Sequence, residues 1–220
     1  MITPEIRARW VAALAGREES VAQAAAQFAD LLAIMADLRG PQGCPWDREQ
    51  SLASLRQYVR EEADEVCAAI DNVMACEDKL RAQHGLAPAD PTPPDGDERA
   101  RTEKKGHTIA HHPHRADFDP TASAAGAPLP AELTDAERAE LDQLYDELAG
   151  ELGDLLLQAA FQGDILWAMG RGGCEDFLRH IIAKLIRRHP HVYGAIQVAD
   201  SAEVLANWEQ IKAGERGSPA

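Results

Sequence analysis

Two features of β-rich proteins are scarce in this sequence. Runs of β-branched residues are few, and no stretch keeps up an alternation of apolar and polar residues. Strands with one buried face need that alternation, so its absence argues against a sheet. The apolar residues make up 45% of the 220 residues and are mainly Ala and Leu, which is enough for a core. We therefore expect an all-α fold.

Cysteine and long apolar runs are also sparse. The four cysteines form no CxxC pair and no dense framework, which favours reduced thiols in a cytoplasm. The N-terminus shows no apolar region followed by a cleavage site, and no run of about 18 apolar residues occurs. We therefore expect a cytoplasmic protein with no export signal and no membrane partner.

Basic residues are fewer than acidic residues in the chain as a whole. The chain holds 22 Lys and Arg against 37 Asp and Glu, for a net charge of -15. A surface for a nucleic-acid polymer or an anionic membrane needs basic patches, so neither partner is expected. A phosphate ligand stays compatible with this charge if a metal ion and a few local cations make the contact.

The sequence patterns predict a series of helices. Apolar periodicity, capping pairs and Gly/Pro breaks predict helices over residues 4–15 and 20–38, then one from an Asp47/Gln50 cap to between Val73 and Leu80. A Thr134/Glu137 capping box predicts a long helix to about Met169. Two more helices follow, one around residues 177–188 and a short one after an Asp200/Glu203 cap.

The domain prediction follows from composition. Residues 1–80 and 134–213 form the two parts of one domain, and residues 214–220 form a frayed tail. Residues 81–130 contain eight of the thirteen prolines and five of the eight histidines, so 81–133 is predicted to be a flexible insertion. Its histidine cluster can be read as a transition-metal site, but the spacing matches no zinc pattern and a solvated linker is favoured: His107, His111, His112 and His114.

Carboxylates interrupt two of the predicted apolar stripes. Glu62 completes a stripe that runs through Val59 and Val66, with Glu61 and Glu65 beside it. On the long helix, Glu151 falls between Leu148 and Leu155, and Asp154 lies one turn further on. An ionised carboxylate taken from water needs a partner, either Arg or Lys in ion pairs or a metal ion. The two pairs, without basic residues at the facing stripe positions, favour a hard divalent cation with oxygen ligands.

A basic and aromatic group follows towards the C-terminus. Lys184 and Arg188 share a helix face, and Trp208 and Lys212 share another. These cations can hold the phosphates of a ligand, and Trp208 can stack on a base. Core packing of Trp208 and a solvated helix end are the alternatives. Periodicity and charge alone do not name a reaction.

The motifs, taken in order, resemble the MazG nucleoside triphosphate pyrophosphohydrolases. They cover roughly residues 27–76 and 140–213, and they read RGPQGCPWDREQ from Arg39, EExxE from Glu61, ELGD from Glu151, KLIRRHPHVY from Lys184 and WEQIK from Trp208. The resemblance implies an all-α, four-helix site in a homodimer or higher oligomer. It also implies Mg2+-dependent hydrolysis of a nucleoside triphosphate to the monophosphate and pyrophosphate, with Mn2+ as an alternative ion.

Site residues carry over from the resemblance position by position. The implied metal ligands are Glu62, Glu65, Glu151 and Asp154, with Glu61 assisting directly or through a water. The implied nucleotide-binding residues are Lys184, Arg188, Trp208 and Lys212, and Trp46 and Gln50 would line the base pocket. Two departures from the family pattern are the long segment between the acidic motifs and the presence of one such domain where many members carry two in tandem.

Three functions are compatible with these residues. The first is nucleotide hydrolysis, including a house-cleaning activity on non-standard nucleotides. The second is a nucleotide-sensing or dimerisation module with weak activity or none, which has little reason to keep five acids. The third is a di-iron protein, which is disfavoured because neither acidic helix carries a Glu-x-x-His pair. The sequence does not predict the preferred base or sugar.

Overall fold

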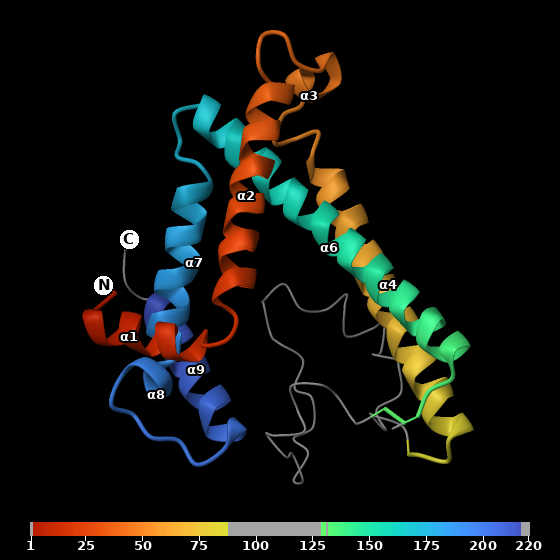
Figure 1. The fold of residues 1–220 in the computed structure, drawn as a ribbon. Helices are drawn as coiled ribbons and strands as arrows, with labels where there is room; N and C mark the ends of the chain where they lie inside the picture. The colour runs from red at the N-terminus through yellow and green to blue at the C-terminus, as the bar shows by residue number, and fades with distance from the viewer. Residues whose placement is uncertain (1, 88–128, 131, 217–220) are drawn as a thin grey trace. The chain divides into compact units, whose positions relative to one another are not determined.

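The described part of the chain is helical throughout. A computed structural model describes residues 2–87, 129–130 and 132–216, and it places eight helices and no strand within them (Figure 1). This confirms the all-α prediction. The helices are α1 (Pro4–Ala13), α2 (Glu18–Leu38), α3 (Pro45–Glu49), α4 (Arg56–Gln83), α6 (Asp135–Ala168), α7 (Cys174–Arg188), α8 (Pro190–Tyr193) and α9 (Ser201–Arg216).

The predicted start of the first acidic helix was wrong. Residues 45–49 form their own short helix, α3, with Pro45 in its first turn, and Gln50 ends it in an extended conformation. The Gln50 amide donates to the Trp46 carbonyl at 2.9 Å and accepts from the Ser54 hydroxyl at 2.8 Å. The cap-like pattern from Asp47 to Gln50 therefore belongs to α3 and its C-terminal end, and α4 begins later, at Arg56.

Two other helix ends can be compared with the prediction, namely the start of α6 and the end of α9. The Thr134 hydroxyl accepts from the Glu137 backbone N–H at 3.2 Å, and the Glu137 carboxylate accepts from the Thr134 N–H at 2.7 Å. This reciprocal pair confirms the capping box. Hydrogen bonds from the Thr134 backbone and side chain also lower the pKa of Glu137. At the other end of the chain, α9 is longer than predicted and includes residues 214–216, which the sequence had placed in the tail.

The described chain divides into two compact units. The first comprises Met1–Ala63 and Gly153–Ala220, and the second comprises Asp64–Leu152. Both dividing points fall inside continuous helices, one within α4 and one within α6. The predicted insertion lies mostly outside the described residues, and so does its histidine cluster.

The core of the first unit joins α2, the start of α4 and the second half of α6. Its buried side chains include Met35, Leu55 and Phe161. The Arg39 Nε atom lies 2.6 Å from Asp164 Oδ2, and the Arg39 guanidinium covers the Phe161 ring at 5.2 Å. This partly buried ion pair ties the end of α2 to α6.

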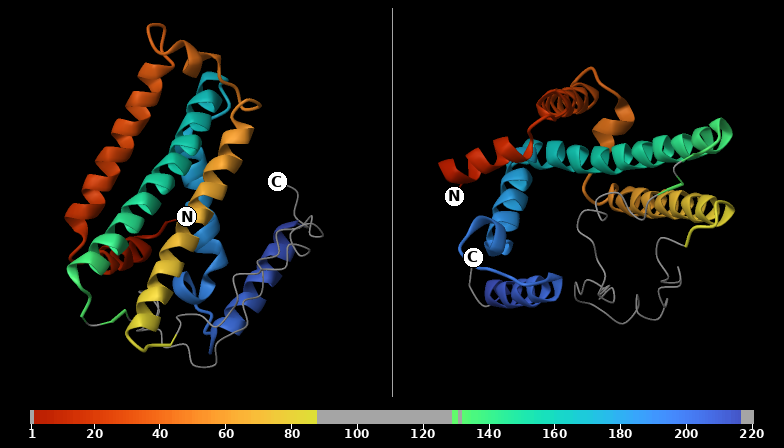
Figure 2. Two further views of the ribbon diagram at one scale, coloured as in Figure 1. Left: turned by 90° about the vertical axis from the view of Figure 1, so that its right-hand side faces the viewer. Right: turned by 60° about the horizontal axis from the view of Figure 1, so that its bottom comes forward.

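The core of the second unit lies between α4 and α6, which run side by side in Figure 2. Cys76, Leu80 and Leu141 are buried there, and Leu129 and Leu133 pack against them. Both of those leucines fall at the end of the predicted insertion, so its last residues contribute to the core. The stripe of small and apolar residues on α4 that was expected to be buried is buried from Val66 onwards.

A hydrogen bond in the second unit gives a spectroscopic prediction. The Tyr145 hydroxyl donates to Glu77 Oε1 at 2.6 Å. That hydrogen bond, with help from burial and the Glu77 charge, raises the pKa of Tyr145 to about 12. The folded state therefore holds this proton more tightly than the unfolded chain. Its contribution to stability is complete below the ordinary pKa of 10.0 and is lost as the pH rises through about 12.

An alkaline titration of phenol absorbance checks this. One of the three tyrosines should ionise well after the others, and this late step should disappear in Tyr145→Phe. In Glu77→Gln the step should move towards the ordinary pKa. A late step that persists in Tyr145→Phe would show that another phenol is responsible.

Helix α2 is unusually exposed for its composition. By length and apolar content alone it is able to cross a membrane, and only 6% of its apolar window is buried. Core helices of soluble proteins and signal sequences pass the same test, so this is weak evidence. The expectation that the chain has no membrane span remains a prediction.

Candidate metal and nucleotide site

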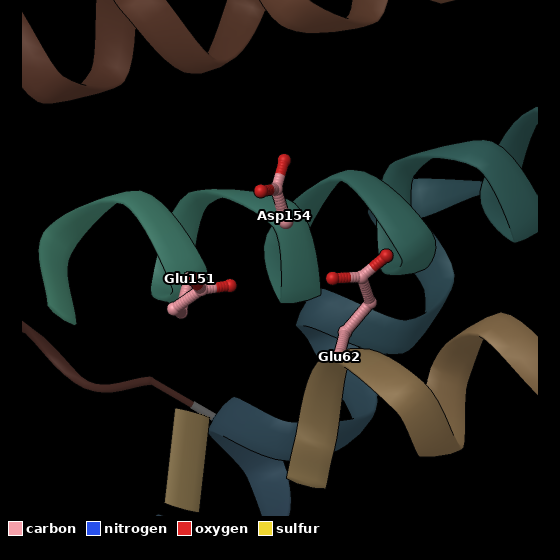
Figure 3. Close-up of side chains that lie close together, drawn as sticks. All are labelled: Glu62, Glu151 and Asp154. Atoms are coloured by element: carbon pink, nitrogen blue, oxygen red, sulfur yellow. The ribbon is translucent and has the colours of Figure 1, made fainter. Parts of the chain in front are cut away.

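Three carboxylates from two helices lie together. Glu62 projects from α4 towards Glu151 and Asp154 on α6, as Figure 3 shows. One oxygen from each residue lies within 4.8 Å of the other two. Glu62 and Asp154 belong to the same compact unit, and Glu151 is placed one turn before Asp154 by the unbroken helix α6. The juxtaposition predicted from two helical stripes is therefore present.

The group is shallower than the sequence suggested. Glu62 and Glu151 are half-buried, whereas Asp154 is exposed, as are Leu152 and Leu156 beside it on α6. Glu61 and Glu65 are exposed on α4, and Glu65 is not one of the three residues that converge. An ion at this place is reached directly from solvent.

The donor set fits a hard divalent cation. At an effective dielectric of about 20, two unit charges about 5 Å apart repel by about 3 kcal/mol, and less where solvent screens them. Among the described residues, Glu151 and Asp154 have no ion pair with Lys or Arg. Carboxylate oxygens at this spacing are ligands that Mg2+ and Mn2+ accept.

A glutamine beside the group strengthens the fit. The Gln158 amide donates to Glu62 Oε1 at 3.4 Å, and Gln158 lies one turn after Asp154 on α6. Its Oε1 atom is buried and accepts no hydrogen bond from the described residues. A buried carbonyl oxygen without a donor is costly, so a cation or a bound water next to it would satisfy it. Sequence reasoning missed Gln158, although its spacing places it on the face of Glu151 and Asp154.

The basic and aromatic residues form a second group, between α7 and α9. The Arg188 guanidinium lies 5.6 Å from the centre of the Trp208 ring, and Lys212 Nζ lies 4.8 Å from it. Lys212 is buried and pairs with Glu209 at 2.9 Å. The Trp208 indole N–H is buried and donates to none of the described residues. Lys184 is exposed one turn before Arg188.

Part of the chain matches a known protein family. Residues 131–193 match the family model of the MazG nucleotide pyrophosphohydrolase domain. A nucleoside triphosphate pyrophosphohydrolase of Escherichia coli K12 is 32% identical over 195 residues, which cover 88% of this chain and 48% of the relative. The chain therefore contains a match to the MazG domain over residues 131–193. This confirms the resemblance of the motifs.

Two other relatives extend the comparison. The nucleoside triphosphate pyrophosphohydrolase/pyrophosphatase MazG of Thermotoga maritima is 30% identical over 191 residues, which cover 86% of this chain and 46% of the relative. The Bacillus subtilis protein YabN is 28% identical over 87% of this chain, which corresponds to 25% of YabN. The chain spans about half the length of the two relatives named as nucleoside triphosphate pyrophosphohydrolases. No solved structure gives a significant match.

The residues predicted for a base pocket lie on and after α3. Trp46 is 50% exposed, and its ring meets Tyr58 and Phe161 edge-on, with centroids 5.9 and 6.5 Å apart. Gln50 is half-buried and holds the turn after α3 through its side chain. Trp46 therefore sits firmly on the first unit with part of its ring in solvent.

Glu215 was not among the site residues predicted from the sequence. Glu215 pairs with both Arg187 and Arg188 in the basic group. Its position, seven residues after Trp208 and three after Lys212, places it on the same face of α9. That spacing was a usable signal, but residues from 214 onwards had been assigned to a frayed tail.

Proposed function

We propose that this protein hydrolyses nucleoside triphosphates to the monophosphate and pyrophosphate, with Mg2+ as cofactor and Mn2+ as a substitute. The observation that carries the proposal is the convergence of Glu62, Glu151 and Asp154 within 4.8 Å of one another. The family match and the two relatives named as nucleoside triphosphate pyrophosphohydrolases support it.

The acidic group would hold the metal ion. The proposed ligands are Glu62, Glu65, Glu151 and Asp154, with Glu65 one turn along α4 from Glu62. When bound, such an ion neutralises charge on phosphate oxygens and lowers the pKa of a coordinated water. Gln158 holds the Glu62 carboxylate in place through its amide.

A carboxylate of α4, either Glu61 or the ligand Glu65, would also move the proton. Glu61 or Glu65 accepts a proton from the attacking water, and both carboxylates are exposed. The water oxygen bonds to the α-phosphorus while the bond to the bridging oxygen breaks, and pyrophosphate leaves. The catalytic residues we propose are therefore Glu61, Glu62 and Glu65.

The basic group would bind the rest of the nucleotide. Lys184, Arg188 and Lys212 supply charge for the phosphates. Two of these cations, Arg188 and Lys212, lie over the Trp208 ring. We propose Trp46 and Gln50 for the base, since the half-exposed Trp46 ring offers an aromatic face.

We also propose that the chain forms a homodimer or a higher homo-oligomer. Apolar side chains are exposed on α2 and α7, among them Ile34 at 54% and Leu185 at 48%. A groove of about 840 Å³ follows α7 and is lined by Leu178, Ile182 and Ile186. Apolar faces of this size in a soluble protein favour a partner surface. A second copy of the chain is the partner that the family resemblance implies.

The proposed setting is the cytoplasm, with no membrane and no nucleic-acid polymer as partner. The four cysteines are unpaired thiols in the structure, and the net charge is -15. A house-cleaning role on non-standard or excess nucleotides fits a hydrolase of free triphosphates.

A pyrophosphate-release assay over a panel of nucleoside triphosphates tests the proposal. With Mg2+ we expect equal amounts of monophosphate and pyrophosphate, and no turnover when a chelator replaces the metal. Orthophosphate and a diphosphate as products would place the attack at another phosphorus and contradict the mechanism. Binding without turnover across the panel would favour the nucleotide-sensing module. Iron in the purified protein would favour the di-iron alternative.

A further inference from the structure

One acidic side chain lies inside the basic group of α7 and α9. Glu215 Oε1 lies 2.6 Å from Arg187 Nε, and Glu215 Oε2 lies 2.5 Å from Arg188 Nη2. A third contact joins Arg188 Nε to Glu215 Oε1 at 3.3 Å. The Glu215 carboxylate therefore contacts Arg188 through both of its oxygens, and its Oε1 atom also contacts Arg187.

The contact uses one edge of the Arg188 guanidinium. A guanidinium has five N–H donors in a planar fork, and a carboxylate takes two of them in a bidentate pair. Glu215 takes the edge formed by Nε and Nη2. Arg188 Nη1 donates to none of the described residues, so the opposite edge keeps its donors.

Two side chains on one face of α9 lie against this guanidinium. Trp208 and Glu215 are seven residues apart on α9, which places them two turns apart on one side of the helix. Trp208 lies under the guanidinium at 5.6 Å, and Glu215 holds its edge. The Arg188 and Glu215 side chains are 18% and 24% exposed, so solvent screens their pair only in part.

We propose that Glu215 is a positioning residue for phosphate binding: it holds Arg188 by one edge of the guanidinium and so presents the opposite edge to phosphate oxygens. The inference deepens the proposed function and rests on it, because it takes Arg188 as a nucleotide-binding residue. Its ligand class is the phosphate chain of a nucleoside triphosphate.

The charge balance is compatible with this role. Glu215 carries one negative charge and pairs with Arg187 and Arg188, which carry one positive charge each. These three residues together keep one net positive charge, which can attract an anion. Hydrogen bonds from Arg188 and then from Arg187 lower the pKa of Glu215 to about 2, which keeps the carboxylate ionised in neutral solution. The rival reading is that Glu215 competes with phosphate for Arg188. The two readings predict opposite changes in KM.

The test compares Glu215→Ala and Glu215→Gln in the full chain by pyrophosphate release with saturating Mg2+. Ordering one long side chain in a binding step weakens binding by roughly twofold to tenfold, so Glu215→Ala should raise KM by about that factor and leave kcat nearly unchanged. Glu215→Gln should recover part of the loss, since its amide oxygen still accepts from the guanidinium. An unchanged or lowered KM in Glu215→Ala would overturn the proposal.

Two comparisons separate this proposal from the proposed function. Glu140→Gln is the matched control, because Glu140 holds a lysine of the second unit, Lys79, at 2.8 Å and should leave KM unchanged. Arg188→Ala should raise KM, and Glu215→Ala should add nothing in that background. If Arg188→Ala leaves KM unchanged, the nucleotide-binding role of Arg188 is wrong. If Arg188→Ala raises KM and Glu215→Ala does not, only the role of Glu215 is wrong.

Discussion

Pyrophosphate release is expected to fall by about a hundredfold or more in Asp154→Asn, as it does when a charge-stabilising group is removed from other catalytic sites. Asp154 supplies one of three carboxylates within 4.8 Å of one another, and the amide removes a charge and a ligand oxygen with little change in shape. Glu62→Gln should have the same effect. Initial rates with excess Mg2+ measure it.

The control for this prediction lies on the same helix. Asp146 is an exposed aspartate of α6, and Asp146→Asn should keep the rate of the wild type. All three variants should keep the helical circular dichroism of the wild type. In metal-free buffer, Asp154→Asn should melt no lower than the wild type, because it relieves repulsion within the group. A wild-type rate in Asp154→Asn would refute the metal site.

The second large effect is expected from one added methyl group in α6. An ideal Cβ at Gly163 would lie 2.3 Å from Cys174 Sγ and 3.3 Å from the Cys174 backbone N. Overpacking of this kind costs about 1–3 kcal/mol, and the better helix propensity of alanine offsets up to about 1 kcal/mol. Gly163→Ala should therefore lower the free energy of unfolding by up to about 2 kcal/mol in a urea titration.

Gly150→Ala is the matched comparison on the same helix. An ideal Cβ at Gly150 meets no atom within 4 Å, so only the propensity gain remains. This variant should raise the free energy of unfolding by about 0.5–1 kcal/mol. If both variants change stability with the same sign, the close approach of α6 to the start of α7 is wrong.

Helical spacing was enough to predict the acidic group but not its full membership. Glu62 and Glu151 interrupt apolar stripes, which face each other when helices pack, and Asp154 lies one turn from Glu151. Glu65 comes three residues after Glu62, which turns its side chain by about 60° around the helix axis. The structure leaves Glu65 exposed and outside the group of three.

Other features depended on tertiary contacts that local patterns do not encode. The start of α4 was mispredicted because Asp47 lies inside the separate short helix α3, which Gln50 ends. How deeply the three carboxylates are buried depends on which side chains cover α6 near Leu152 and Leu156. Both leucines are exposed in the structure. The pairing of Arg188 with Glu215 arises where α7 and α9 dock, across 27 residues of sequence.

Binding of Mn2+, followed by its electron paramagnetic resonance signal, tests the central claim most directly. The wild-type chain should bind the ion, whereas Glu62→Gln and Asp154→Asn should lose most of that affinity and Asp146→Asn should keep it. Equal Mn2+ binding by all four proteins would mean that the acids of α4 and α6 do not hold the metal, and the account would be wrong.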